Sequence, residues 1–487
     1  MTRAGRLSAL DSIFLPMETA AQSLHVGSVL VLEGPSPDPQ QLRDRVVARL
    51  SAAPVARSRV MRMPLDLGRP IWVDAGELRP EEHLHHVVLE APGGESELSA
   101  EVVRIMAASM DPRRPLWELW QVDGLSAGRW AVVLKAHHTM VDGRTGADLV
   151  RRLLTESPDA SDAGTAGDAS EPGDVVDAED ALSRDAVQGA PHRVPSRTAL
   201  LADLASWLVH LPVRGVRLLL QVVARPGETR RRAAELRLGL AQVLRPDLPP
   251  SVLSGPLSAR RSWGWVEADL ARAVQASRAA HCTVNDLYLA ALAGGYRRFL
   301  LGRGDALTDV GLRAIVPVSN RSLRRPARLG NLASALFVEL PVDVPETDAR
   351  LRLVAARTAA QKAEGVPRAT AALLRAADHI PAPLFAWGAR RYGRAGQGRV
   401  NVVATNLQGP STVGYLAGRR VLAMLPYVPT AQEIRSCTAM VSYAGCLTIA
   451  VTADDDALPD ADRLVEAVGG ELECLLAPPV EAVASRP

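Results

Sequence analysis

Aromatic residues are few in this 487-residue sequence, and it has neither long apolar runs nor a strong net charge. Phe, Trp and Tyr make up 4% of it, and no cluster of Lys and Arg is interleaved with them. The pattern typical of nucleic-acid-binding proteins is therefore missing, and we expect no nucleic-acid partner. No uninterrupted apolar run reaches the roughly 18 residues that a membrane-spanning helix needs, so we expect no transmembrane helix.

Cysteines are few, and their spacing indicates neither disulfides nor a metal site. The four of them, Cys282, Cys437, Cys446 and Cys474, form no CxxC pair. We therefore expect reduced thiols and no bound metal. Residues 1–14 contain charges but not the apolar segment of a secretory signal. These features predict a cytoplasmic protein that is able to lie on the inner face of the plasma membrane without crossing it.

An acidic segment divides the chain. Residues 156–185 hold ten acidic residues against one basic residue, Arg184. Such a segment buries too little apolar surface to offset the entropy lost on ordering. We therefore predict a disordered linker over residues 156–196, between an N-terminal lobe (1–155) and a C-terminal lobe (197–487).

Both sides of the linker alternate apolar runs typical of strands with amphipathic stretches typical of helices. This alternation predicts an α/β fold in two lobes. The predicted strands are residues 26–32, 117–123, 130–136, 262–266, 312–318, 335–340, 400–405 and 447–453, and the predicted helices are residues 39–52, 98–109, 146–154, 284–301 and 348–364.

A basic helical segment follows the linker at residues 198–244. It begins apolar and then gains Arg225, Arg230, Arg231, Arg232 and Arg237. The pattern favours a solvated helix pair that covers the core. The alternative is an interfacial helix that meets anionic lipid headgroups.

The main chemical signal is His137-His138-Thr139-Met140-Val141-Asp142-Gly143, which follows a predicted strand and precedes a predicted helix. Consecutive strand residues point to opposite faces, so the two histidines are poorly placed to bind one metal ion. One histidine is expected to face a cleft while the other packs. A neutral imidazole suits general-base work on a hydroxyl group. Asp142 is expected to fix the local geometry through an ion pair, and Gly143 lets the backbone turn.

This motif resembles the HHxxxDG signature of the coenzyme-A-dependent acyltransferases. Further blocks occur in order along the chain and together are similar to the bacterial bifunctional wax ester synthase/diacylglycerol acyltransferase family. These blocks are LSALDSIFLPMETAAQSLHVG (7–27), DPRRPLW (111–117), TVNDLYLA (283–290), VPVSNR (316–321), TNLQGP (405–410), LAGRRV (416–421) and YAGCLTIAVTADD (443–455).

The resemblance implies a two-lobed fold of the chloramphenicol acetyltransferase type, with the active site in a tunnel between the lobes. It implies transfer of a long-chain acyl group from acyl-CoA to diacylglycerol or a fatty alcohol, with acyl-CoA as co-substrate and no other cofactor. It assigns the general base to His138 and a supporting role to His137. It also implies that Asp142 pairs with an arginine, for which Arg321 is the first candidate and Arg313 the second, and that Asn285 and Asp286 shape the site.

Two other functions remain open at this stage. Residues 74–82 lack an aromatic that is common in the family, so the acceptor is alternatively a specialised metabolite or a glycolipid. A non-catalytic lipid-binding relative is the third hypothesis, and the intact HHxxxDG motif argues against it. The GxSxG pattern at residues 124–128 is typical of a hydrolase nucleophile, but a second strand follows it where that motif needs a helix. We therefore interpret Ser126 as part of a turn.

Overall fold

The computed structural model describes most of the chain. The described residues are 6–19, 21–51, 53–63, 68–141, 143–158, 196, 198, 202, 205, 209, 224–305, 307, 311–319, 333–394 and 398–477. Residues 159–195 of the predicted linker lie outside this set, as does most of the segment 198–223. The predicted disorder of the linker therefore stays a prediction.

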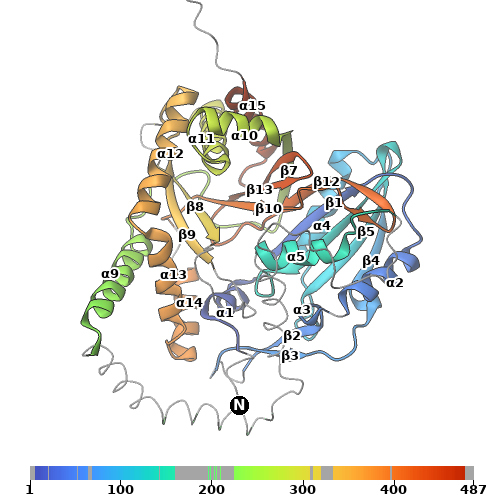
Figure 1. Ribbon diagram of the computed structural model, residues 1–487, viewed down its shortest axis with the longest axis horizontal. Helices are drawn as coiled ribbons and strands as arrows, with labels where there is room; N and C mark the ends of the chain where they lie inside the picture. Colours follow the sequence, from blue (N-terminus) through green and yellow to red (C-terminus); the bar gives the residue numbers. More distant parts are fainter. Residues whose placement is uncertain are drawn as a thin grey trace, which may run out of the picture.

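Two six-stranded sheets, one in each lobe, form the frame of the described chain (Figure 1). The N-terminal sheet has the order β11-β12-β1-β6-β5-β4, and the C-terminal sheet has the order β7-β14-β13-β10-β8-β9. The strands of the N-terminal sheet are β1 (His25–Leu32), β4 (Leu84–Val88), β5 (Trp117–Leu125), β6 (Arg129–His137), β11 (Tyr415–Leu416) and β12 (Arg419–Tyr427). The strands of the C-terminal sheet are β7 (Arg261–Asp269), β8 (Leu312–Ser319), β9 (Ala333–Leu340), β10 (Val402–Gln408), β13 (Ser436–Tyr443) and β14 (Cys446–Asp454). A separate pair is formed by β2 (Ser58–Met61) and β3 (Ile71–Asp74).

Helices cover both sheets. In the N-terminal lobe these are α1 (Ala9–Met17), α2 (Pro39–Leu50), α3 (Pro54–Arg57), α4 (Glu95–Ala107) and α5 (Gly143–Leu153), and in the C-terminal lobe they are α9 (Pro226–Val243), α10 (Leu270–Ala279), α11 (Val284–Gly302), α12 (Thr347–Ala363), α13 (Val366–Ala377), α14 (Ala382–Arg394) and α15 (Ala461–Leu476). Within the described ranges, no helix is both long and apolar enough to cross a membrane.

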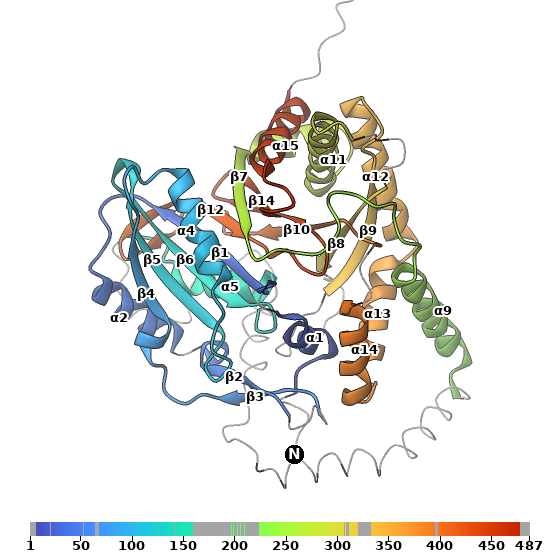
Figure 2. The ribbon, with the colours of Figure 1, turned by 180° about the vertical axis from the view of Figure 1, so that it is seen from behind.

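Strand β6 lies near the centre of the N-terminal sheet and is buried on both faces. Trp130, Val132, Leu134 and Ala136 point to the face covered by α2 and α5. The residues between them point to the face covered by α4, which also contacts β7 of the other lobe (Figure 2). Burial on both faces explains why residues 130–134 of β6 form a continuous apolar run rather than an alternating one.

The two lobes are joined by a strand that crosses between them. Strand β12, which follows β10 of the C-terminal sheet in the chain, pairs antiparallel with β1, for example Leu30 with Met424. The segment 415–427, assigned from the sequence to the C-terminal lobe, therefore completes the N-terminal sheet.

The C-terminal lobe packs its helices closely. A Cβ atom on Gly295 of α11 would lie 2.4 Å from a Val468 methyl group and 2.9 Å from the Val468 Cα on α15. Only glycine lets the two helices approach this far. The strands and helices predicted for both lobes are confirmed, apart from shifts of a few residues at their ends.

Several elements were not predicted. They include α1, β12 and α14, and α1 matters most for the site. Its capping box is visible in the sequence, since Ser8 accepts from the Asp11 amide while the Asp11 carboxylate accepts from Ser8. The helix is only nine residues long and contains Pro16, so hydrophobic periodicity gives little sign of it.

Candidate active site

The two histidines of the HHTMVDG segment lie where β6 ends. His137 is the last strand residue, and its amide donates to the Leu116 carbonyl at 2.9 Å. The His138 amide donates to the Leu24 carbonyl at 2.9 Å, and the Met140 amide donates back to His137 at 2.8 Å. Both histidines are thus fixed by backbone hydrogen bonds to segments on either side of β6.

His137 is buried, with 1% of its surface exposed. Its Nδ1 accepts a hydrogen bond from the Thr139 amide at 3.0 Å, so in the neutral ring the hydrogen sits on Nε2. Nε2 lies 3.4 Å from Glu18 Oε2. Burial lowers the pKa of His137 and outweighs the opposing effect of Glu18. The supporting role expected for His137 stays a prediction.

His138 has a different environment. From Trp130 to Val141 it is the one residue that is not buried. Its ring stacks on Phe14 of α1, with ring centroids 4.2 Å apart and an interplanar angle of 14°. The motif therefore places one histidine in the protein interior and one at a partly exposed position. The strand argument does not account for this difference, because β6 ends at His137 and is buried on both faces, and His138 lies in the turn that follows.

A carboxylate that the sequence reasoning missed joins this site. Glu18 follows α1 as its C-cap residue, and its Oε1 lies 3.3 Å from Nε2 of His25 at the start of β1. Burial raises the pKa of the Glu18 carboxyl, but the contacts with His137 and His25 outweigh it and hold that pKa well below its usual range. Glu18 and His25 both lie in the block 7–27, which carries part of the family resemblance. Their place in this block is the sequence feature that could have marked them as site residues.

The predicted Asp142 ion pair stays a prediction, because Asp142 and its first candidate partner, Arg321, lie outside the described residues. The second candidate, Arg313, makes its described contacts within the C-terminal lobe, where its guanidinium donates to the Arg399 carbonyl at 3.0 Å and to Glu339 at 3.3 Å. Gly143 is the first residue of α5, and its expected role in the turn stays a prediction.

Asn285 and Asp286 begin α11. The Asp286 carboxylate accepts from the Thr283 amide at 3.0 Å and from the Thr358 hydroxyl at 2.6 Å. It is therefore an internal helix cap, in keeping with a shaping role rather than proton transfer. Asn285 Oδ1 accepts a hydrogen bond from the side-chain amide of Asn406 at 3.2 Å. This bond links the start of α11 to the TNLQGP block on β10.

The Pro115-Leu116-Trp117 segment lies beside the end of β6. Trp117 is buried, donates from Nε1 to the Ala56 carbonyl at 2.8 Å and stacks on His83. Its neighbour Leu116 accepts the His137 amide. These contacts place PLW against the strand that bears the histidines.

Ser126 lies in the turn that connects β5 to β6, within a short 3₁₀ segment over Ser126–Gly128. The strand-turn-strand arrangement confirms that GxSxG here is not a nucleophile elbow. Among the described side chains, no group of three or more His, Cys, Asp or Glu is placed to hold a metal ion.

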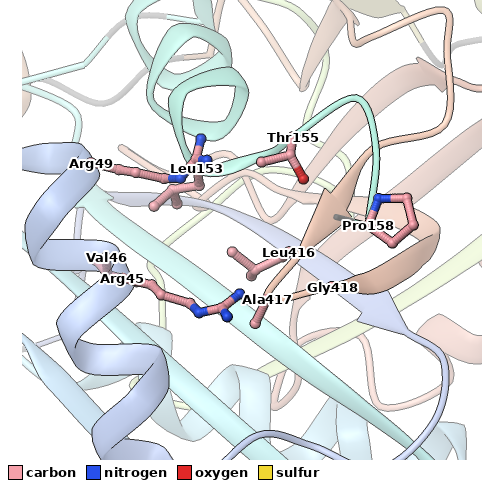
Figure 3. A pocket seen from close by; sticks show the side chains of 9 residues that line it. All are labelled: Arg45, Val46, Arg49, Leu153, Thr155, Pro158, Leu416, Ala417 and Gly418. Carbon is pink, nitrogen blue, oxygen red and sulfur yellow. The ribbon is translucent and has the colours of Figure 1, made fainter. Parts of the chain in front are cut away.

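A surface hollow lies between α2, the end of α5 and the β11–β12 turn (Figure 3). Arg45, Arg49 and Thr155 line it together with apolar side chains, and neither His137 nor His138 does. Its open space of about 10 Å³ is roughly enough for one water molecule. An acyl-CoA needs far more room, and the predicted tunnel between the lobes stays a prediction.

Comparison with known proteins identifies the family. Residues 7–288 match the wax ester synthase/diacylglycerol acyltransferase catalytic domain, and residues 329–475 match the WS/DGAT C-terminal domain. The chain belongs to this family. It is therefore an acyltransferase, and the histidine pair lies within the part that matches the catalytic domain.

Curated relatives agree over nearly the full length. The chain is 33% identical over 473 residues to a probable diacylglycerol O-acyltransferase of Mycobacterium tuberculosis, covering 97% of this chain and 96% of the relative. A second, putative diacylglycerol O-acyltransferase of that organism is 29% identical over 497 residues, with 97% of each chain covered.

Solved structures show the same fold. The wax ester synthase/diacylglycerol acyltransferase from Marinobacter aquaeolei VT8 has a TM-score of 0.64 at 23% identity, covering 96% of this chain and 98% of that one. The first condensation domain of the CDA synthetase has a TM-score of 0.55 at 16% identity, with 98% and 97% covered. The predicted two-lobed CoA-dependent acyltransferase fold is confirmed.

Proposed function

We propose that this acyltransferase moves a long-chain acyl group from acyl-CoA to the free hydroxyl of diacylglycerol, and to fatty alcohols as alternative acceptors, with His138 as the general base. The observation that carries the proposal is the exposure of His138 alone within an otherwise buried segment, in a chain whose relatives are named diacylglycerol O-acyltransferases.

The transfer is direct. His138 removes the proton from the acceptor hydroxyl while that oxygen attacks the thioester carbonyl. The carbon–sulfur bond then breaks, and the protonated His138 returns its proton to the CoA thiolate, so that ester and free CoA leave. Holding both substrates beside His138 lowers the entropic part of the barrier. This route uses acyl-CoA as co-substrate and needs no further cofactor.

We also propose that the acceptor reaches the site from a lipid surface contacted by α14. Leu384 and Trp387 are 56% and 61% exposed, and their spacing of three residues places them on one side of this helix. Ile380, which is 40% exposed, lies just before the helix begins. Exposed arginines Arg375 and Arg391 flank them. Apolar side chains bordered by arginines suit an anionic membrane face or a lipid droplet.

This surface adjoins the site through α1. Helix α14 packs against α1, which carries Phe14 on His138 (Figure 1). Helix α9 packs on the neighbouring α13 and exposes Arg230, Arg231 and Arg232, so the basic segment predicted from the sequence borders the same region.

Product identification tests the proposed function. Palmitoyl-CoA is incubated with diacylglycerol, hexadecanol, a glycolipid and a hydroxylated metabolite in parallel, and the products are separated by thin-layer chromatography. We expect triacylglycerol as the main product and wax ester as the second. Turnover of only the glycolipid or the metabolite would overturn the choice of acceptor.

The base is tested by His138→Ala, with His86→Ala at the edge of the N-terminal sheet as the matched control. General-base catalysis contributes about 10²- to 10⁴-fold, so we expect a loss of that size in kcat for His138→Ala and little change for the control. Near wild-type turnover by His138→Ala would show that another group removes the proton.

Vesicle flotation tests the lipid surface. The double variant Leu384→Ser/Trp387→Ser should lose most of its binding to vesicles that contain phosphatidylglycerol. Leu301→Ser, which removes an exposed leucine (49%) from α11, is the control and should bind normally. Equal binding by both variants would exclude α14 as the contact.

A further inference from the structure

We infer that Glu18 is a positioning residue for acyl transfer, which holds His137 in a single tautomer and thereby fixes the turn that presents His138. The inference rests on the proposed role of His138 as the base.

The two oxygens of the Glu18 carboxylate face two different buried imidazoles. Oε2 lies 3.4 Å from His137 Nε2, and Oε1 lies 3.3 Å from His25 Nε2. His25 and His137 are also directly paired residues of β1 and β6, with ring centroids 5.8 Å apart. One carboxylate thus ties the end of α1 to the two central strands of the N-terminal sheet.

The contact at His137 selects the position of the ring hydrogen. Because Nδ1 accepts the Thr139 amide, Nε2 has to carry the hydrogen, and a carboxylate is the acceptor that favours this tautomer. In the opposite tautomer Nδ1–H would point at the Thr139 N–H, and two donors would oppose each other. The turn from His137 to Val141, which includes His138, would then lose its internal support.

The contact at His25 holds the second oxygen of the Glu18 carboxylate. His25 Nδ1 lies 2.8 Å from the Met106 carbonyl, and its Nε2 faces Glu18 Oε1 at 3.3 Å. His25 is 1% exposed, so this side of the carboxylate is also fixed in the protein interior.

Helix α1 thereby contacts both histidines of the motif. Phe14 stacks on His138, and Glu18, one turn later, faces His137. The Thr139 hydroxyl donates to the Asp11 carbonyl of the same helix at 3.1 Å. Glu18 acts through His137 and these neighbours and not on the substrate.

The test is Glu18→Gln, which keeps the shape of the side chain and removes its charge. We expect kcat to fall about tenfold or more, as for a small misplacement of a catalytic group, with KM for both substrates within about twofold. Asp123→Asn is the matched control, because Asp123 forms another carboxylate–histidine pair in the same lobe, with His86 at 2.7 Å. It should keep kcat within about twofold of the wild type.

Two further measurements separate positioning from a general loss of structure. ¹⁵N NMR of labelled histidines should show the Nε2–H form of His137 in the wild type and a mixture of tautomers in Glu18→Gln. In the His137→Asn background, where no imidazole tautomer remains, Glu18→Gln should change kcat by less than about twofold, because effects that run through one residue are not additive.

The inference is overturned if Glu18→Gln keeps kcat, or if its effect is equally large in the His137→Asn background. Should Glu18→Gln fail to fold, Glu18→Asp replaces it and should retain the wild-type tautomer and part of kcat. Failure of the proposed base is seen separately, as activity that survives His138→Ala, whatever the tautomer of His137.

Discussion

In the C-terminal lobe the Glu471 carboxylate lies between two arginines, whereas in the N-terminal lobe the Glu18 carboxylate lies between two histidines. Glu471 on α15 bonds Arg350 of α12, and its other oxygen is 3.1 Å from Arg298 of α11. Glu471 is 1% exposed and Arg350 is 2% exposed, while Glu18 is 30% exposed.

The difference lies in what the partners can do with a proton. An arginine stays charged at any physiological pH, so the Glu471 cluster is a permanent link between three helices. A neutral histidine ring has one nitrogen that donates and one that accepts, so the Glu18 cluster is able to set which nitrogen of His137 carries the hydrogen. The same carboxylate arrangement therefore serves packing in one lobe and, by our inference, the reaction in the other.

The largest effect is expected from Glu471→Gln. The variant leaves the Arg350 cation buried without its carboxylate, which typically costs about 3–5 kcal/mol. Urea unfolding should show this loss of stability, while kcat per folded molecule stays unchanged. A large fall in kcat without a loss of stability would show that the two clusters do not divide packing and chemistry as we describe.

His137→Ala should be milder than His138→Ala. It removes the acceptor of the buried Thr139 amide, at a cost of about 1–3 kcal/mol. We expect kcat to fall about tenfold, measured with the preferred acceptor, while His138→Ala loses far more. An equal loss in both variants would mean that His137 also takes part in proton transfer.

Phe14→Ala removes the ring that stacks on His138. Such a contact is worth about 0.5–1.5 kcal/mol, so kcat/KM should fall roughly threefold to tenfold. Phe14→Leu keeps much of the apolar bulk, so its kcat/KM should lie between those of the wild type and Phe14→Ala. An unchanged rate in Phe14→Ala would show that α1 affects the site only through Glu18.

The smallest expected effect is a loss of stability in mild acid, and it arises from buried histidines of the N-terminal lobe. Burial lowers the pKa values of His83 and His137, so the folded protein takes up protons less readily than the unfolded chain, whose histidines titrate near pH 6.5. Their contribution to stability is therefore complete above about pH 6.5 and is lost as the pH falls from there towards the folded-state pKa values. The lowered pKa of Glu18 acts in the same direction below about pH 4.5.

Thermal unfolding between pH 7.5 and 5.5 measures this effect. We expect the midpoint to fall, by about 2–4 °C for each kcal/mol lost in a domain of this size. His83→Asn removes one titrating group while an amide replaces Nδ1, which donates to the Trp117 carbonyl, and it should flatten the curve. An unchanged slope in this variant would place the pH dependence elsewhere.

Much of the fold was predictable from local patterns. The apolar run from Trp130 to Leu134 predicted strand β6, and the helix predicted over 284–301 is α11. Helix α1 and strand β12 were not predicted, because α1 is short and contains Pro16, and β12 acquires its partner β1 only across the lobe boundary.

The sequence by itself determined the motif, the order of the family blocks and the strand that ends at the histidines, since these depend on residues adjacent in the chain. The tertiary structure alone decided which histidine is buried, and it brought Glu18, His25 and His137 within contact distance. The physical reason is that these contacts join a helix end to two strands that pair across more than a hundred residues of chain. Hydrophobic periodicity and capping signals report only on neighbours, so they carry no information about such pairing.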